Sequence, residues 1–314
     1  MRKICYLMLL LCATFNAKSQ ENNGEKLKWL NKNAVDLKSA YLKTLSAQLG
    51  QNVMVGLGEA SHGTEEFFRE KNKIVEYLIT DQKYTQIGFE VPDEAMAKVN
   101  DYVTSGKGDL KLLLKDFRLY HTKSFFDLFE WVKNYNLDPK HTKIEVFGFD
   151  NAGYTNPFER DSLMAKNAVE RQTKTKAKMV VWSHNLHLLK DTTGGYKAFG
   201  YFLNKHYKTD FFNIAFDTYE GKVNTISVND DGTSEVTAHQ LETPATGFTA
   251  LFAKARYDNF FIDFRNINPF SGVKDSITNI WADWRAPYAM PIRVGNDFDA
   301  IIFIKNTTAS LPLN

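Results

Sequence analysis

The amino-acid sequence predicts an α/β fold, a three-layer sandwich with a largely parallel central sheet and an added helical subdomain. Short runs of β-branched and aromatic residues alternate with longer amphipathic stretches along the 314 residues, which is the pattern of strands joined by helices. The composition is 43% hydrophobic and 24% charged. Such a balance is typical of an ordinary folded protein and excludes disordered and fibrous classes.

The first half of the chain supplies three predicted strands and three predicted helices. The strands are residues 52–57, 85–89 and 143–149, and the helices are residues 65–80, 93–103 and 124–135. Gly58 ends the first strand, and the helix that follows carries a broad apolar stripe that includes Phe67, Ile74 and Leu78. We interpret residues 93–139 as the helical insertion.

The second half continues the alternation and then becomes less regular. A helix is predicted at residues 157–175, and strands at 178–182, 211–216, 223–228, 259–264 and 300–304. The polar stretch 229–247 is rich in Thr, Asp and Gly, which predicts a loop. Residues 266–293 are predicted to be irregular, because Pro269, Trp281, Trp284 and Pro287 lie close together.

Residues 1–20 have the pattern of an export signal, which makes residues 21–314 the mature domain. Arg2 and Lys3 precede the uncharged apolar run 4–15, and small residues before Gln20 offer a cleavage site. The apolar run is shorter than the about 20 residues that a membrane-spanning helix needs. The expected location is therefore the periplasm or the exterior, although a buried first helix would have a similar pattern.

Cleavage would leave a mature chain without cysteine, because Cys5 and Cys12 are the two cysteines of the sequence. A lipid anchor on Cys12 is disfavoured by the bulky Leu11 before it. Disulfides, thiolate metal sites and cysteine nucleophiles are then excluded together. No later segment is apolar enough to span a membrane, so no stable membrane insertion is expected after cleavage.

The charge balance gives no support to nucleic-acid binding. Cleavage removes three of the 39 basic residues and none of the 37 acidic ones, which changes the formal net charge from +2 to −1. A near-neutral chain without a basic tract lacks the electrostatic footprint that phosphate backbones require.

Side chains that can transfer protons or bind metals lie at or just after the carboxyl ends of five predicted strands. They are Glu59, His62, Glu90, Asp150, His184, His187 and Asp217. Ligands of open parallel sheets bind outside the carboxyl ends of the strands, so we expect these residues to gather at one edge.

Each of these residues also has a purely structural interpretation. Glu59 and Thr64 are suited to the N-terminus of the next helix, and Asp150 and Asp217 to turns. We interpret the remaining histidines as ordinary polar residues: His121, His141, His206 and His239. Arg69 lies two helical turns after His62 and either pairs with Glu90 or is a solvated charge.

Three chemistries compete for this set of residues. A serine hydrolase requires Gly-x-Ser-x-Gly, whereas Ser61 stands one residue out of that register. A metal site could use His184, His187 and a carboxylate, although His-x-x-His alone is a weak signal. We favour a histidine base, His62, that a carboxylate holds while it deprotonates water. Glu59 or Glu90 would be that carboxylate, and His184 and His187 would donate to the developing oxyanion.

The motifs resemble those of the erythromycin esterase family. The resemblance begins at GLGEASHGTEEFF (56–68) and continues, in order, through GFE (88–90), EWVKNYN (130–136), VFGFD (146–150), RDSLMAKN (160–167), VVWSHNLH (180–187), FGYFL (199–203) and FDAIIFI (298–304). The match covers most of the chain from about residue 50.

This resemblance implies an α/β core with a helical part and hydrolysis of the macrolactone ring of macrolide antibiotics. It implies that His62 is the general base, that Glu59 and Glu90 are its carboxylate partners, and that Arg69, His184 and His187 complete the site. Arg69 and Asp150 are our candidate substrate-binding residues. The aromatic segment 266–291 is a candidate wall for a large apolar substrate.

The predicted function is therefore an exported, metal-independent hydrolase that acts on a small-molecule ester, erythromycin or another macrolide. No cofactor is expected, although the resemblance leaves a metal open. Two alternatives remain: an exported haem- or metal-binding protein that uses the same histidines, and a hydrolase of an unrelated cell-envelope ester.

Overall fold

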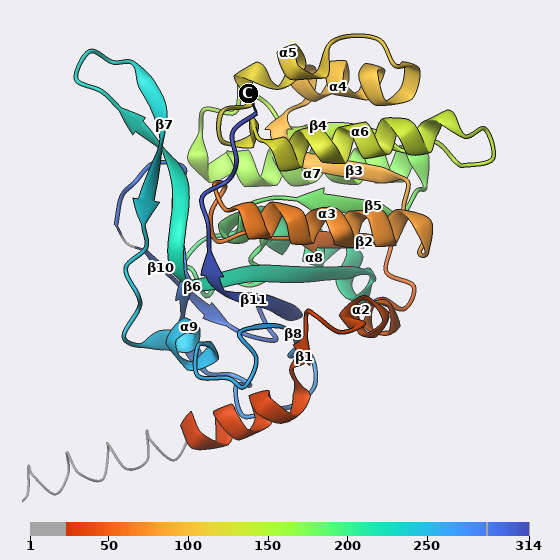
Figure 1. The fold of residues 1–314 in the computed structure, drawn as a ribbon. Coiled ribbons are helices and arrows are strands. Elements are labelled where there is room, and N and C mark those ends of the chain that lie inside the picture. Colours follow the sequence, from red (N-terminus) through yellow and green to blue (C-terminus); the bar gives the residue numbers. More distant parts are fainter. Residues whose placement is uncertain (1–22, 287, 314) are drawn as a thin grey trace, which may run out of the picture.

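A computed structural model describes residues 23–286 and 288–313 of the chain. The predicted export signal, Cys5 and Cys12 lie outside the described residues. Within them, nine strands form one sheet, and eight of these lie side by side (Figure 1). Their order is β1 (Val35–Asp36), β8 (Asn259–Asp263), β11 (Ala300–Thr307), β6 (Phe211–Val228), β2 (Met54–Leu57), β5 (Met179–Trp182), β3 (Gln86–Pro92) and β4 (Glu145–Asp150); the ninth strand, β7 (Ser234–Gln240), pairs with β6.

The sheet is largely parallel, as predicted. The six neighbouring strands from β11 to β4 all pair in parallel, and β8 and β1 add an antiparallel edge. Every residue of β2 and of β5 is buried, which is typical of parallel strands that are covered on both faces.

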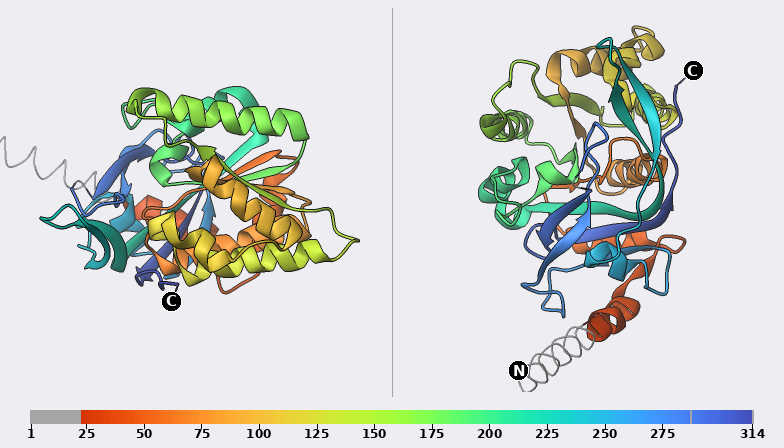
Figure 2. Two further views of the ribbon diagram at one scale, coloured as in Figure 1. Left: turned by 90° about the horizontal axis from the view of Figure 1, so that it is seen from above. Right: turned by 90° about the vertical axis from the view of Figure 1, so that its left-hand side faces the viewer.

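The two faces of the sheet form two separate apolar cores. In β2 and β5, Val55, Leu57 and Val180 face one core, whereas Met54 and Val181 face the other. This alternation follows from the two-residue period of a strand. The result is the predicted three-layer sandwich, and Figure 2 shows helices on both sides of the sheet.

The helices divide between these faces. One face is covered by α2 (Tyr41–Leu49), α3 (Glu65–Thr80), α4 (Asp93–Ser105) and α6 (Lys123–Leu137), and the other by α7 (Pro157–Thr175) and α8 (Phe199–Tyr207). The helices α4 and α6, with the short α5 (Leu110–Leu114) and the 3-10 helix η1 (Lys115–Tyr120), fill the connection from β3 to β4. Within the described residues, no helix is both long and apolar enough to cross a membrane.

The predictions for residues 211–247 were correct for the strand residues 211–216 and 223–228 and wrong for what lies between and after them. Residues 223–228 are not a separate strand but the second half of β6, which runs over 18 residues. The predicted loop 229–247 contains β7, which pairs with that second half as an antiparallel hairpin. The hairpin projects away from the helices (Figure 1). Val228 is 71% exposed and Val236 is 49% exposed, so the hairpin lacks the apolar alternation that marks a half-buried strand.

The segment 266–293 is more regular than predicted. It contains β9 (Lys274–Thr278) and β10 (Ala289–Arg293), which form a separate two-stranded antiparallel sheet. The helices α2 and α8 and the short helices α5 and α9 (Gly247–Phe252) were also not predicted. The buried residues of α2, Tyr41, Leu45 and Leu49, recur every four positions, which is a helical signal in the sequence.

Asp217 was predicted to lie just past the end of a strand, but it lies inside β6. Its side chain is fully buried. The Thr249 hydroxyl donates to its Oδ2 at 2.7 Å, and the Thr278 amide donates to its Oδ1 at 3.0 Å. Burial raises the pKa of the Asp217 carboxyl to about 7 despite these hydrogen bonds. Asp217 is therefore a core residue that links β6 to α9 and β9.

This raised pKa predicts a pH-dependent contribution to stability. Since the unfolded carboxyl ionises near its model value of 3.8, the folded state holds a proton that the unfolded state has already lost. The contribution of Asp217 to stability is then complete below pH 4 and falls as pH rises through 7. For Asp217→Asn, the free energy of unfolding relative to wild type should increase by about 1.4 kcal/mol per pH unit between pH 5 and 7 and level off above 8.

Urea denaturation at several pH values measures this difference. Asp127→Asn, at an exposed carboxylate of α6 that pairs with Lys123, is the matched control and should keep a constant offset from wild type. A constant offset for Asp217→Asn as well would contradict the assigned pKa.

Candidate active site

The predicted site residues gather where four neighbouring strands, β2, β5, β3 and β4, end at one edge of the sheet. Glu59 and His62 lie between β2 and α3, His184 and His187 follow β5, Glu90 lies near the end of β3, and Asp150 is the last residue of β4. The parallel sheet thus brings together side chains that are up to 128 positions apart in the sequence.

The carboxylate of Glu59 is fully buried and accepts hydrogen bonds from four side chains. Tyr120 donates to Oε1 at 2.8 Å, while Lys71 and Trp182 donate to Oε2 at 2.6 and 3.0 Å. The fourth partner is His62, whose Nδ1 lies 2.7 Å from Oε1. Burial alone would raise the pKa of Glu59, but the Lys71 charge and the His62 hydrogen bond lower it below its ordinary value.

These contacts determine which nitrogen of His62 is free. Nδ1 lies 2.7 Å from Glu59 Oε1 and 2.9 Å from the Tyr120 hydroxyl. Burial and the Glu59 charge raise the pKa of Tyr120 well above 10, so its hydroxyl keeps its proton and donates it to Glu59. Nδ1–H therefore donates to the ionised Glu59, and Nε2 carries the lone pair. With 15% of its side chain exposed, His62 is accessible enough to meet a small molecule.

Lys71 supplies the positive charge opposite Glu59. Its side chain is fully buried, and Nζ lies 4.3 Å from the centre of the Trp182 ring. Burial lowers the pKa of Lys71 to about 8, against the opposing effect of Glu59. The ammonium therefore lies between the Glu59 carboxylate and the rings of Trp182 and Phe216.

His184 packs beside His62 but has no free N–H group. The two ring centroids are 4.9 Å apart. Nε2 of His184 lies 3.1 Å from the Ile280 carbonyl and 3.3 Å from the Ala60 carbonyl, and the Leu186 amide donates to Nδ1. Burial and the neighbouring His62 lower the pKa of His184 to about 3. His184 is therefore a neutral ring whose hydrogen bonds are all made within the protein.

Glu90 is a second buried carboxylate that gathers donors. Its Oε2 accepts from the Ser183 hydroxyl at 2.7 Å and from the His184 amide at 3.0 Å. Its Oε1 lies 3.1 Å from both Arg160 Nη2 and His187 Nε2. Burial would raise the pKa of Glu90, but the charge and hydrogen bond of His187 and the charge of Arg160 hold it well below its ordinary value.

His187 bridges two carboxylates. Nε2 faces Glu90 at 3.1 Å, and Nδ1 faces Asp161 at 2.7 Å. Burial lowers the pKa of His187, but the two carboxylates outweigh burial and raise it to about 10. His187 is therefore an imidazolium at neutral pH, and both of its N–H groups are engaged.

Asp150 joins the site through Arg160. The Nε and Nη2 atoms of Arg160 lie 3.2 and 2.6 Å from Asp150 carboxylate oxygens, in a bidentate pair. Nη2 also reaches Glu90, whereas Nη1 lies 3.2 Å from His187 Nε2. Because the protonated His187 cannot accept a hydrogen bond, Nη1 is left to donate to a ligand. The Arg160 side chain is 28% exposed.

The predicted role of Arg69 does not fit this geometry. Arg69 is exposed on α3, and the arginine that pairs with Glu90 is Arg160. The face that α3 turns to the site carries Lys71, two positions further along the helix. Helical spacing from His62 alone could not identify that face, because the residues before Glu65 are not helical.

Sequence reasoning also missed Tyr120, Trp182 and Asp161 as partners of the predicted residues. For Lys71 a signal existed: it lies four residues after Phe67, within the apolar stripe of α3, where a charge requires a buried partner. Tyr120 lies in η1, inside the helical insertion, and no local pattern connects it to Glu59. Among residues 23–286 and 288–313, no three His, Cys, Asp or Glu side chains converge as metal ligands.

The fold and the site define a class: an α/β protein with a carboxylate-held histidine at the carboxyl edge of a parallel sheet. The family model for erythromycin esterase matches residues 79–159 and 152–307. The chain therefore belongs to the erythromycin esterase family.

Individual relatives are distant. YbfO of Bacillus subtilis strain 168, which carries the name of a hydrolase, is 25% identical over 190 residues, 57% of this chain and 41% of YbfO. Erythromycin esterase type II of Escherichia coli is 30% identical over 111 residues, 34% of this chain and 26% of that protein. The aligned part of the chain thus spans less than half the length of these two relatives.

Solved structures extend the likeness of the fold. A Bacillus cereus protein superimposes with a TM-score of 0.82 at 22% identity, over 92% of this chain and 99% of the other. A mutant of the erythromycin esterase EreC in its open conformation gives a TM-score of 0.65 at 14% identity, over 88% of this chain and 96% of EreC. At these identities the likeness establishes the α/β fold and not the substrate.

Because Lys71 is buried against Glu59, its substitution should cost far more stability than substitution of Lys73, an exposed lysine of the same helix. Lys71→Met leaves Glu59 buried without its cation, which should lower the free energy of unfolding by about 3–5 kcal/mol at pH 7. The matched control is Lys73→Met, because Lys73 is 57% exposed where it pairs with Glu70. That variant should lose less than about 1 kcal/mol.

Urea denaturation between pH 7 and pH 4 shows how much of the stability lost in Lys71→Met comes from the missing charge and how much from lost packing. In wild type, the lowered pKa of Glu59 gives stability that is present above the ordinary carboxyl pKa and is lost as pH falls. In Lys71→Met, Glu59 becomes easier to protonate, so the deficit should shrink toward pH 4. A deficit that stays the same at both pH values would assign the loss to packing alone.

Proposed function

We propose that this protein is a hydrolase that opens the macrolactone ester of macrolide antibiotics such as erythromycin, with His62 as the general base that activates water. The observation that carries the proposal is the Glu59–His62 pair, which leaves Nε2 of a partly exposed histidine as the proton acceptor. The substrate class is supported by family membership and by the relative named erythromycin esterase type II.

The proposed reaction proceeds through a tetrahedral intermediate. His62 Nε2 takes a proton from water while the water oxygen forms a bond with the ester carbonyl carbon. The imidazolium that results is stabilised by the ionised Glu59, which the Lys71, Tyr120 and Trp182 donors hold in place. The bond from carbon to the ring oxygen then breaks, and the proton on Nε2 passes to the leaving alkoxide.

Arg160 is the donor best suited to the developing oxyanion. We expected His184 and His187 to fill this role, but their N–H groups are engaged by backbone carbonyls and carboxylates. Nη1 of Arg160 remains available, and Asp150 and Glu90 hold its guanidinium in a fixed orientation. In this proposal His184 and His187 position the base and the arginine and do not touch the substrate.

The site uses imidazole and carboxylate groups that already have partners within the protein, which supports a reaction without a bound metal. Removal of residues 1–20 by an export machinery is part of the same proposal, and it would place a cysteine-free enzyme in the periplasm or outside the cell.

The first test is His62→Ala, assayed by mass spectrometry for the gain of one water by erythromycin. Loss of the base should lower kcat by about 10³-fold or more while the melting temperature stays near that of wild type. His206→Ala, an exposed histidine of α8, should retain wild-type activity. The protein is dialysed against EDTA beforehand, so wild-type turnover also tests the metal-independent route.

Two outcomes would contradict the assignment. Wild-type turnover in His62→Ala would remove His62 as the base. Absence of macrolide opening by wild type, together with turnover of other esters in a substrate panel, would retain the hydrolase and reject the macrolide. Absorbance or stoichiometric metal in the purified protein would favour the haem- or metal-binding alternative.

The second test is Glu90→Gln. The amide cannot accept from Ser183, His184, Arg160 and His187 as a carboxylate does, so Arg160 loses one of its two anchors. We expect kcat for erythromycin to fall about 10²-fold or more, with a smaller effect on KM. Normal activity in this variant would show that the oxyanion donor does not depend on Glu90.

A further inference from the structure

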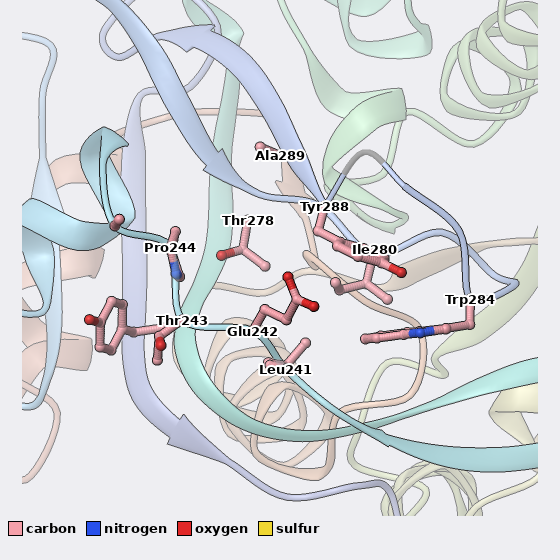
Figure 3. A pocket seen from close by; sticks show the side chains of 11 residues that line it. Leu241, Glu242, Thr243, Pro244, Thr278, Ile280, Trp284, Tyr288 and Ala289 are labelled. Carbon is pink, nitrogen blue, oxygen red and sulfur yellow. The ribbon is translucent and has the colours of Figure 1, made fainter.

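A pocket of about 310 Å³ opens between the base of the β6–β7 hairpin and residues 278–289 (Figure 3). Leu241, Ile280, Trp284 and Tyr288 form its apolar wall, and all four belong to a small apolar cluster that has Val223 behind it. The volume is at the lower end of small-molecule sites. The pocket is therefore suited to one substituent of a larger molecule.

One negative charge lines this pocket, on the solvent-exposed residue Glu242. Glu242 is the one Asp, Glu, Lys, Arg or His among the described residues that line it. Figure 3 shows its carboxylate directed into the pocket, toward Tyr288 and Ile280. Because the lining contributes no lysine or arginine, a ligand that is buried here and bears a positive charge would meet a carboxylate without a competing cation.

Stacked rings form one side of the pocket. The rings of Trp284 and Tyr288 stack with their centroids 4.7 Å apart, and His239 stacks on Trp284 at 4.5 Å. Tyr288 is thus the end of a stack of three rings. Aromatic rings attract cations to their electron-rich faces, and a nearby carboxylate adds to this attraction.

The pocket is joined directly to the catalytic residues through Ile280. The Ile280 amide donates to the Ala60 carbonyl at 2.7 Å, and the Ile280 carbonyl lies 3.1 Å from His184 Nε2. Ala60 stands between Glu59 and His62 in the loop that carries the base. Ile280 therefore lies between a ligand group in the pocket and the proposed hydrolytic site.

We propose that this pocket binds a protonated or quaternary amine on an apolar body, and that it is the subsite which holds such a substrate beside His62. Glu242 neutralises the ammonium, Tyr288 contacts its alkyl groups, and Leu241 and Ile280 cover the apolar part. The subsite role rests on the proposed hydrolysis, whereas the binding of the amine does not.

The test compares two probes of one shape, (4-hydroxyphenyl)trimethylammonium and 4-tert-butylphenol, by calorimetric titration of the full chain. Wild type should bind the cation about tenfold more tightly than the neutral probe. Glu242→Gln should abolish this preference and leave the Kd of the neutral probe within twofold. The matched control is Glu235→Gln, at an exposed carboxylate of β7, which should keep the preference.

Equal binding of the two probes by wild type would overturn the proposal, and so would the loss of the preference in Glu235→Gln. Because titration needs no turnover, these results do not depend on whether erythromycin is the substrate. The subsite role has its own readout: the cationic probe should inhibit macrolide opening by wild type and inhibit Glu242→Gln about tenfold more weakly. Binding without inhibition would reject the subsite and retain the amine pocket.

Discussion

The rest of the site depends on the burial of the Glu59 charge. A carboxylate with no exposed surface is costly unless every lone pair finds a donor, and Glu59 receives its donors from four different parts of the fold: Lys71 from α3, Trp182 from β5, Tyr120 from η1 and His62 from its own loop. Any arrangement that satisfies this carboxylate also brings those elements together. The same hydrogen bonds that compensate the buried charge fix the orientation of the His62 ring.

Much of the fold and part of the site could be predicted from the sequence. Parallel strands are buried on both faces, so they can be recognised in the sequence as short apolar runs. Because they run in the same direction, their carboxyl ends lie at the same edge of the sheet. This is why Glu59, His62, Glu90, His184 and His187 were found together. The limits of α7 were predicted to the residue, since proline and a charged amphipathic surface mark it clearly.

The remaining features depend on tertiary contacts that leave no local pattern. Tyr120 reaches Glu59 from 61 positions away, and Arg160 reaches Glu90 from 70. The choice of Arg69 over Lys71 shows the same limit, because the direction of a side chain depends on where the helix begins. The strand β7 was missed because it is largely exposed, and exposed strands do not need apolar alternation.

The length of β6 determines how far the pocket lies from His62. Its first half pairs with β2 in the sheet, while farther along Asn224 donates its amide to the Gly63 carbonyl, next to His62. A Cβ on Gly63 would lie 1.9 Å from the Asn224 carbonyl oxygen, so the two backbones are in direct contact. Tyr219, earlier in the same strand, lines the pocket. Because an extended strand cannot stretch, the number of residues in β6 determines the spacing between His62 and the pocket. Side-chain substitutions can change what the pocket accepts, but only an insertion or deletion in the strand can change its distance from His62.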